Sequence, residues 1–104
     1  MTNTSTLTGL LRQLELELKR LGWWDEIPPE PALLQSEMPF AVDTLAPQQW
    51  LQWIFIARIQ QIMVQGASLP KGFLLTPYFE EAWKEQRDTQ TLLSILRTID
   101  EVSQ

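Results

Sequence analysis

Residues 47–66 read PQQWLQWIFIARIQQIMVQG and form the most apolar stretch of the chain. Pro47 suits the first position of a helix, because its φ angle is already helical and its missing amide hydrogen is not needed there. Gly66 suits the left-handed residue that ends a helix. Large apolar side chains between the two cover nearly every face, and a helix of that kind is usually surrounded by other helices. The sequence therefore predicts a helix over 47–65 at the centre of the fold.

This helix is not predicted to span a membrane. Its longest unbroken apolar run is residues 53–57, whereas a membrane helix needs about 20 apolar residues. Residues 1–6 also lack the basic start and the apolar run of a secretory signal. We therefore expect a soluble protein in the cytoplasm, with no membrane partner.

Three further helices are predicted, over about 5–21, 77–86 and 89–102. In the first, leucines recur at alternating steps of four and three residues, which aligns them in one apolar stripe. Thr76 and Pro77 have the chemistry of a helix start, and so has Thr89. No segment alternates apolar and polar residues over a convincing length, so no sheet is predicted. The expected fold class is all-α, a single four-helix bundle-like domain of 104 residues.

Residues 23–46, which we call the strap, differ in character from the predicted helices. The strap holds four of the chain's seven prolines and five acids without any lysine or arginine, so it alone carries a charge equal to the chain's net −5. Proline fixes its own φ angle and restrains the residue before it, which favours an extended, stiff chain. Many large apolar side chains argue against a disordered linker. We expect an ordered strap that wraps the helices and buries alternate side chains.

Several short motifs are shared with a known family. They are FAVDTL at 40–45, WLQW at 50–53, Arg58, Leu69-Pro70 and Pro77-Tyr78. Together these motifs resemble those of the YqcC-like proteins, small bacterial proteins of unknown function, and the resemblance spans most of the chain, from the leucine helix to the final helix. The resemblance implies an all-helical bundle. It carries no catalytic residues over, because the family has no established activity. Some members are associated with a tRNA pseudouridine synthase, which implies a partner rather than a chemistry.

The composition excludes several kinds of chemistry. The chain has no cysteine and no histidine, which excludes a disulfide framework, thiol catalysis, cysteine-ligated zinc and a histidine base or ligand. A net charge of −5 argues against direct binding to nucleic-acid phosphates. The four glycines stand apart, so no phosphate loop is predicted, and no acidic run has the spacing of a calcium loop. We expect no cofactor, no metal and no catalytic residue, which favours a non-enzymatic role.

Arg58 is the one charged residue between Thr44 and Pro70. A buried charge without a partner is too costly to keep. The favoured interpretation is therefore an ion pair with an acid of the strap or of the last helix. The alternative is a binding site, since the planar guanidinium group binds a carboxylate through two hydrogen bonds.

Asp43 and Thr44 come just before the central helix. The favoured interpretation is turn or capping chemistry, in which their side chains bond nearby backbone amides. The alternative gives both residues a place in a binding site at the start of that helix.

Trp23 and Trp24 are adjacent and cannot both face inward from the end of a helix. We therefore expect one of them to be exposed or covered by the strap, and exposed tryptophan is enriched at binding hot spots. The acids that follow, Asp25 and Glu26, argue against stacking on RNA. Trp53 shares a helix face with the tryptophan three residues before it and is expected in the core.

These observations leave three functions open. The first is a non-catalytic protein-protein interaction module, whose acidic strap and Trp23-Trp24 corner contact a protein partner. The second is a small-molecule or enzymatic pocket between the strap and the helices. The third is an accessory role in tRNA modification through a protein partner. A homodimer through the leucine stripe is also open. The candidate residues for the pocket are Asp43, Thr44, Trp53, Arg58 and Tyr78.

Overall fold

The computed structural model describes residues 3–69 and 71–103. Within these residues every regular element is a helix and there is no strand, so the predicted all-α class is confirmed. A six-residue π-helix, η3, joins α2 to α3, and two short 3-10 helices, η1 and η2, lie in the strap. The elements are α1 (Asn3–Arg20), η1 (Pro31–Gln35), η2 (Pro39–Ala41), α2 (Pro47–Trp50), η3 (Leu51–Ile56), α3 (Ala57–Gln65), α4 (Thr76–Ala82) and α5 (Gln90–Val102).

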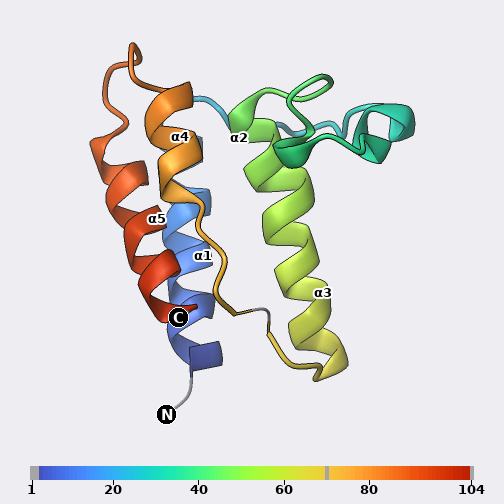
Figure 1. Cartoon of the computed structure of the whole chain (residues 1–104), viewed down its shortest axis with the longest axis vertical. Helices are drawn as coiled ribbons and strands as arrows, with labels where there is room; N and C mark the ends of the chain where they lie inside the picture. The colour runs from blue at the N-terminus through green and yellow to red at the C-terminus, as the bar shows by residue number, and fades with distance from the viewer. Residues whose placement is uncertain (1–2, 70, 104) are drawn as a thin grey trace.

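The chain passes up and down the long axis of the molecule (Figure 1). It rises through α1, crosses the upper end as the strap, and descends through α2, η3 and α3. Residues 66–75, which we call the connector, lead back to α4, and α5 descends beside α1. Together α1, α4 and α5 form one group, and the α2–α3 helix faces it across the core. This arrangement is the expected bundle-like fold.

The leucine stripe of α1 fills one side of the core. Leu14 and Leu18 are fully buried, whereas Leu16, which lies off the stripe, is exposed. Phe79 of α4 and Leu96 of α5 are fully buried against the same cluster. These side chains pack α1, α4 and α5 against one another. Deleting a buried leucine side chain costs about 2–5 kcal/mol, so the contacts contribute strongly to stability.

Glycine ends two of the helices as the sequence predicts. Gly22 follows α1 with a φ angle of 78°, and Gly66 follows α3 with a φ angle of 69°. Beyond Gly22, the amide of Trp23 bonds the carbonyl of Leu18 at 2.8 Å, and the amide of Gly22 bonds that of Lys19 at 3.0 Å. This pair of bonds is the Schellman arrangement, which satisfies the free carbonyls at the end of a helix.

The start of α4 differs from the prediction that Thr76 caps it. The acceptor is instead the carboxylate of Asp100 on α5, which receives the amides of Leu75 at 2.8 Å and Thr76 at 2.9 Å. The hydroxyl of Thr76 also donates to it, at 2.7 Å. The same helix ends at Ala82 rather than at residue 86, because residues 84–91 have no apolar side chain to bury. A buried acid from another helix thus replaces the local cap.

The helix predicted at the centre of the fold consists of α2, η3 and α3, and we call it the central helix because of its place in the sequence. In the structure it lies on one flank of the molecule (Figure 1). It spans the predicted residues 47–65, but its apolar side chains do not all find neighbours. Val64 is 87% exposed, and Ile54 and Ile62 are half-buried. Strap and connector cover part of this surface in place of further helices. Among the described residues, no helix has the length and apolar character that a membrane span requires.

Candidate functional site

The strap is fastened to the central helix at Asp25. The amide of Asp25 donates to the side-chain oxygen of Gln52 at 2.8 Å, and the side-chain nitrogen of Gln52 donates to the carbonyl of Asp25 at 2.7 Å. The carboxylate of Asp25 accepts bonds from the Trp53 indole at 3.1 Å and from the Gln49 side chain at 3.2 Å. Gln52 is buried, and burial makes these bonds costly to lose. They fix the first residues of the strap.

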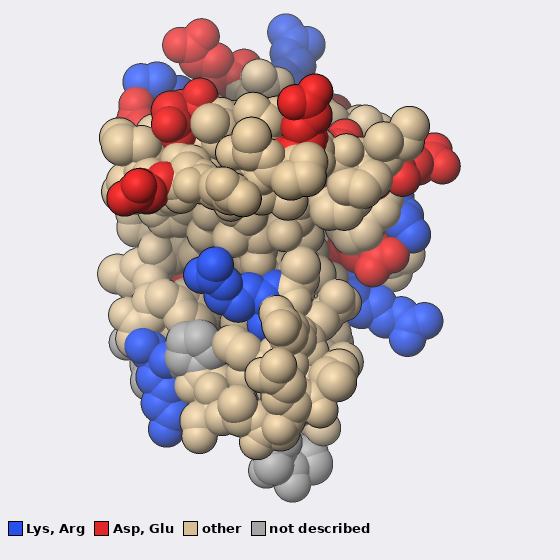
Figure 2. Space-filling model, turned by 90° about the vertical axis from the view of Figure 1, so that its right-hand side faces the viewer, with Lys and Arg blue, Asp and Glu red and all other residues tan. Residues whose placement is uncertain are grey.

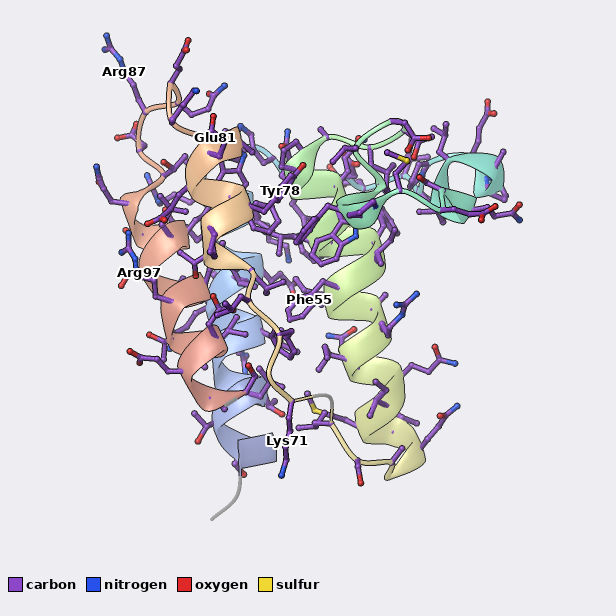
Figure 3. The ribbon with its side chains drawn as sticks, in the orientation of Figure 1. Phe55, Lys71, Tyr78, Glu81, Arg87 and Arg97 are labelled. Carbon is purple, nitrogen blue, oxygen red and sulfur yellow. The ribbon has the colours of Figure 1, made fainter. Side chains whose placement is uncertain are left out.

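A second anchor lies at Phe40. Its ring stacks on Tyr78 with centroids 4.1 Å apart and packs 4.8 Å from Trp50. Phe40 and Ala41 have φ angles of 56° and 50°, in the left-handed region. Such a conformation costs a residue with a Cβ atom roughly 1–2 kcal/mol, and the aromatic contacts offset that cost. Figure 3 shows Tyr78 reaching from α4 toward the central helix. Burial raises the pKa of Tyr78.

Asp43 and Thr44 hold the strap to itself. The Thr44 hydroxyl donates to the carbonyl of Leu33 at 2.8 Å, and the Ser36 hydroxyl donates to the Asp43 carboxylate. These bonds join η1 to the segment after η2. The predicted bonds to nearby backbone amides are therefore not found among the described residues: Thr44 donates to a carbonyl and Asp43 accepts from a hydroxyl, and both partners lie earlier in the strap and not at the start of the helix. The strap itself is less extended than expected, because η1 and η2 compact it.

The outer side of the strap is both acidic and apolar. Ile27 is 81% exposed, Met38 is 51% exposed and Val42 is 49% exposed. Figure 2 shows acidic side chains gathered on the upper part of this face. Residues 44–79 contain no acid at all. The exposed face of the strap therefore combines negative charge with several large apolar groups that solvent reaches.

Trp23 and Trp24 are both half-buried, so neither is the fully exposed tryptophan that is one of the two alternatives. The Schellman turn at Gly22 directs Trp23 toward the core, where its ring lies 5.5 Å from that of Trp83. Trp24 lies back over α1, and the ammonium group of Lys19 is 5.5 Å from its ring centroid. The two indoles therefore seal the upper end of the bundle and do not form a free platform.

Arg58 stands at the edge of an apolar groove of about 320 Å³. Its side chain is exposed and makes no ion pair with any residue that the structure describes, so the predicted pairing with an acid is wrong. The charge needs no partner, since water solvates it. The groove is otherwise lined by apolar side chains of the strap, central helix and connector: Pro39, Phe40, Trp50, Ile54, Phe55, Ile59, Phe73, Leu74 and Leu75.

Only Arg58 among the candidate pocket residues lines this groove. Tyr78 lies behind the ring of Phe40, and Trp53 is half-buried beside Asp25 instead of in the core. Asp43 and Thr44 remain within the strap. The hypothesis of one pocket shared by Arg58 and Asp43 is therefore not supported by the geometry.

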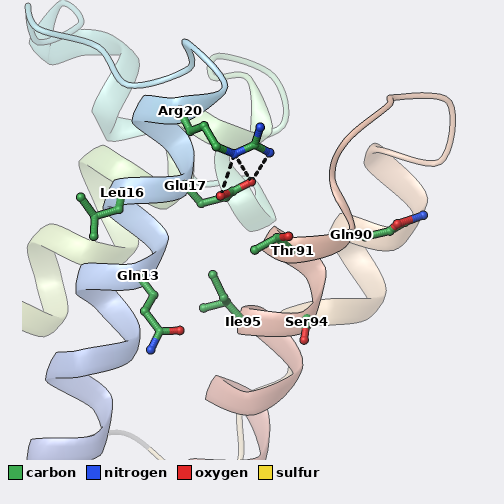
Figure 4. A pocket seen from close by; sticks show the side chains of 8 residues that line it. All are labelled: Gln13, Leu16, Glu17, Arg20, Gln90, Thr91, Ser94 and Ile95. Carbon is green, nitrogen blue, oxygen red and sulfur yellow. Dashed lines mark hydrogen bonds and ion pairs between the residues drawn. The ribbon is translucent and has the colours of Figure 1, made fainter.

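A second groove runs between α1 and α5 (Figure 4). It measures about 610 Å³, and its lining includes Gln13, Gln90 and Ser94. Arg20 donates to the carboxylate of Glu17 at 3.0 Å, and this hydrogen bond lowers the pKa of Glu17. The charges of this groove thus neutralise each other. No cluster of three metal-ligating acids occurs among the residues described.

Comparison with known proteins identifies the family. The profile of the DUF446 family, which is described as tRNA pseudouridine synthase C, matches residues 6–102. The chain belongs to the DUF446 family. The matched residues include the strap, the groove beside Arg58 and all of the helices except the first three residues of α1.

Two relatives of this DUF446 chain match it over most of their length. An uncharacterized protein of Haemophilus influenzae is 39% identical over 92 residues, which cover 88% of this chain and 87% of the relative. The uncharacterized protein YqcC of Escherichia coli is 31% identical over 93 residues, 89% of this chain and 85% of YqcC. The solution NMR structure of YqcC has a TM-score of 0.85 at 30% identity and covers 98% of this chain and 88% of that chain. The resemblance to YqcC-like proteins is confirmed.

A third relative is much longer. The tRNA pseudouridine synthase C of Pectobacterium carotovorum is 29% identical over 84 residues, which cover 81% of this chain but 22% of that protein. This DUF446 chain therefore spans about a fifth of the length of that synthase.

Sequence reasoning missed the anchor residues of this DUF446 protein. Gln52 interrupts an apolar helix between Leu51 and Trp53, and a buried amide must find hydrogen-bond partners. That signal predicts a polar contact at Gln52, though it does not identify Asp25 as the partner. Asp100 gave a similar signal, since it follows Ile99 on the buried side of α5.

Proposed function

We propose that this DUF446 protein is a non-catalytic, cytoplasmic protein-binding module whose strap contacts a protein partner. The observation that carries the proposal is the exposed outer side of the strap, where Ile27, Met38 and Val42 face solvent among acids. Single exposed apolar residues are ordinary, but these three all belong to the strap. A segment held by Asp25 and Phe40 has little freedom left to lose, so binding through it has a small entropic cost.

The chemistry of the strap defines the partner. Exposed acids at Glu26, Glu30 and Glu37 favour a partner surface with a basic rim, because attraction between opposite charges steers the encounter. Salt weakens this attraction. The apolar side chains favour a hydrophobic patch inside that rim. Trp23 packs against Trp83 and Trp24 lies beside Lys19, so the Trp23-Trp24 corner is not part of the proposed contact.

The test is affinity capture from the native cytoplasm with two strap variants. One variant carries Ile27→Ser and Val42→Ser, and the other carries Glu26→Gln and Glu37→Gln. Val64→Ser is the matched control, because Val64 is equally exposed but lies at the end of α3. We expect the wild type and the control to capture the same protein and both strap variants to lose it. Equal capture by all four proteins would overturn the proposal.

A second function is favoured by the Pectobacterium relative. In that protein a segment similar to this chain and a much longer remainder share one polypeptide that is called tRNA pseudouridine synthase C. Joining two domains in one polypeptide raises their effective concentration for each other, which favours a contact between them. We infer an accessory role in which this chain binds a synthase of that kind.

The accessory role is tested with the full-length tRNA pseudouridine synthase C of the organism from which this chain comes. The two proteins are mixed and analysed by size-exclusion chromatography, with and without ribonuclease. Nuclease-resistant co-elution that is lost in the Ile27→Ser, Val42→Ser variant supports it. Separate elution of the two proteins contradicts the accessory role but leaves the strap free to bind another partner.

A further inference from the structure

The groove beside Arg58 is built almost wholly from carbon atoms. Three separate segments supply its walls: Phe40 from the strap, Ile54 from the central helix and Phe73 from the connector, each with apolar neighbours. Leu74 at the edge is 60% exposed. Apolar surface therefore stays in contact with water along the groove, and covering it is favourable because water is released.

The charge at this groove has one sign. Arg58 is the one charged residue that lines it, and its guanidinium group pairs with no acid among the described residues. Residues 44–79, which supply most of the walls, contain no acid, and their other charge is that of Lys71. A ligand with a negative head is therefore preferred over a neutral or positive one. A carboxylate matches the planar fork of arginine, which donates two parallel hydrogen bonds to it.

The size of the groove favours a small molecule over a helix. A volume of about 320 Å³ lies at the lower end of the usual range for small-molecule sites, about 300–1,000 Å³. A docked helix is about 10–12 Å across and needs a groove that continues over several turns. Phe40 of the strap and Phe73 of the connector line this groove, and its volume is too small for several turns of a helix.

We propose that the groove binds a small apolar monocarboxylate. The carboxylate pairs with Arg58, and the hydrocarbon body lies against Phe40, Ile54 and Phe73. Ile27, Met38 and Val42 do not line this groove. The carboxylate proposal can therefore be correct or wrong independently of the proposed protein partner.

Three probes of one chain length separate the contributions of charge and of apolar contact. They are octanoate, octanol and octylamine, which share the hydrocarbon body and differ in the head group. Binding is measured by titration while backbone amide resonances are followed by NMR. We expect octanoate to bind at least tenfold more tightly than octanol, the ratio that one charge-assisted hydrogen bond provides. Octylamine should bind most weakly. The shifted amides should be those of residues 53–59 and 73–75.

Arg58→Gln tests the head-group contact. The side chain is exposed, so the variant should keep the fold, which the NMR spectrum itself verifies. Octanoate affinity should fall about tenfold and octanol affinity should stay unchanged. Arg12→Gln is the matched control, because Arg12 lines a different groove between α1 and α3. It should leave both affinities as they are.

Three outcomes would overturn the proposal. The first is equal binding of the three probes, which means apolar partitioning alone. The second is evidence that octanoate does not bind at Arg58. That evidence would be either an unchanged octanoate affinity in Arg58→Gln or amide shifts confined to the groove between α1 and α5. The third is that none of the probes binds while a protein partner shifts the same amides, which would make the groove a protein contact.

Discussion

Gln52 bonds both backbone groups of Asp25 with its one side-chain amide, at 2.8 Å and 2.7 Å. The amide acts here as a strand neighbour would, since it offers an acceptor and a donor side by side. The strap therefore gains backbone hydrogen bonds without a sheet. Those bonds place a proline-rich segment against the central helix, and the exposed face of the strap is fixed as a result.

Gln52→Leu should lower the free energy of unfolding by about 1–3 kcal/mol, because the amide and the carbonyl of Asp25 would be buried without partners. Urea unfolding followed by circular dichroism measures the change. Gln60→Leu is the control, since Gln60 is exposed on α3 and should change stability by less than about 0.5 kcal/mol. Equal effects of the two substitutions would show that the Asp25 contact contributes nothing.

Asp100→Ala should destabilise the protein by about 3 kcal/mol or more. The buried carboxylate accepts from two backbone amides and one hydroxyl at the start of α4, and its loss leaves those donors without an acceptor. Thermal unfolding measures the effect, and Glu101→Ala, one residue along and exposed, serves as the control. A melting temperature for Asp100→Ala equal to that of the control would contradict the capping role.

Tyr78 is the one tyrosine of the chain, so its phenol can be titrated by ultraviolet absorbance without interference from another. Burial raises its pKa above the usual value of about 10. The unfolded chain loses this proton at a lower pH than the folded one does. The contribution of Tyr78 to stability should therefore be constant below about pH 10 and be lost as the pH rises from there through the folded pKa.

Phe40→Leu should bring the titration midpoint of Tyr78 back toward its usual value, because the stacked ring no longer covers the phenol. Leu93→Ala is a useful comparison, since Leu93 is half-buried on α5 and forms no ring contact with the phenol. A midpoint that moves equally in both variants would reflect general loosening and not the loss of the Phe40 stack.

Arg20→Gln should raise the pKa of Glu17, since the hydrogen bond from Arg20 is the main cause of its lowered value. Carboxyl carbon chemical shifts followed by NMR against pH report the change. A lowered pKa stabilises the fold above the unfolded pKa of Glu17, and that contribution is lost as the pH falls. Arg97→Gln, which removes the partner of Glu80 instead, should leave Glu17 unaffected.

The helices and their ends could be read from local signals. Pro47 and Gly66 bound the central helix in the sequence and in the structure, and the stripe that contains Leu14 and Leu18 is buried. Such signals work because the residues that cause them lie within a few turns of one another. The YqcC structure has the same fold, which agrees with a pattern that the sequence carries throughout.

Contacts between distant residues could not be read in this way. The charge of Arg58 predicted a partner because its helix looked buried on all sides, and the error followed from placing that helix at the centre. The burial of both Trp23 and Trp24 depends on the turn at Gly22 and on Trp83 of a distant helix. The left-handed pair Phe40-Ala41 leaves no local signal, since neither residue favours that conformation.

The two ends of the helical bundle have a consequence for tethering. Helix α1 starts and helix α5 ends at the lower end of the molecule, while the strap projects at the upper end (Figure 1). The long axis measures 36 Å. A polypeptide fused at either of those helix ends therefore begins away from the strap (Figure 1). A spacer of about ten extended residues at ~3.4 Å each would be long enough to run the length of the long axis. Chimaeras with spacers of graded length would show how the effective concentration of the fused polypeptide at the strap depends on spacer length.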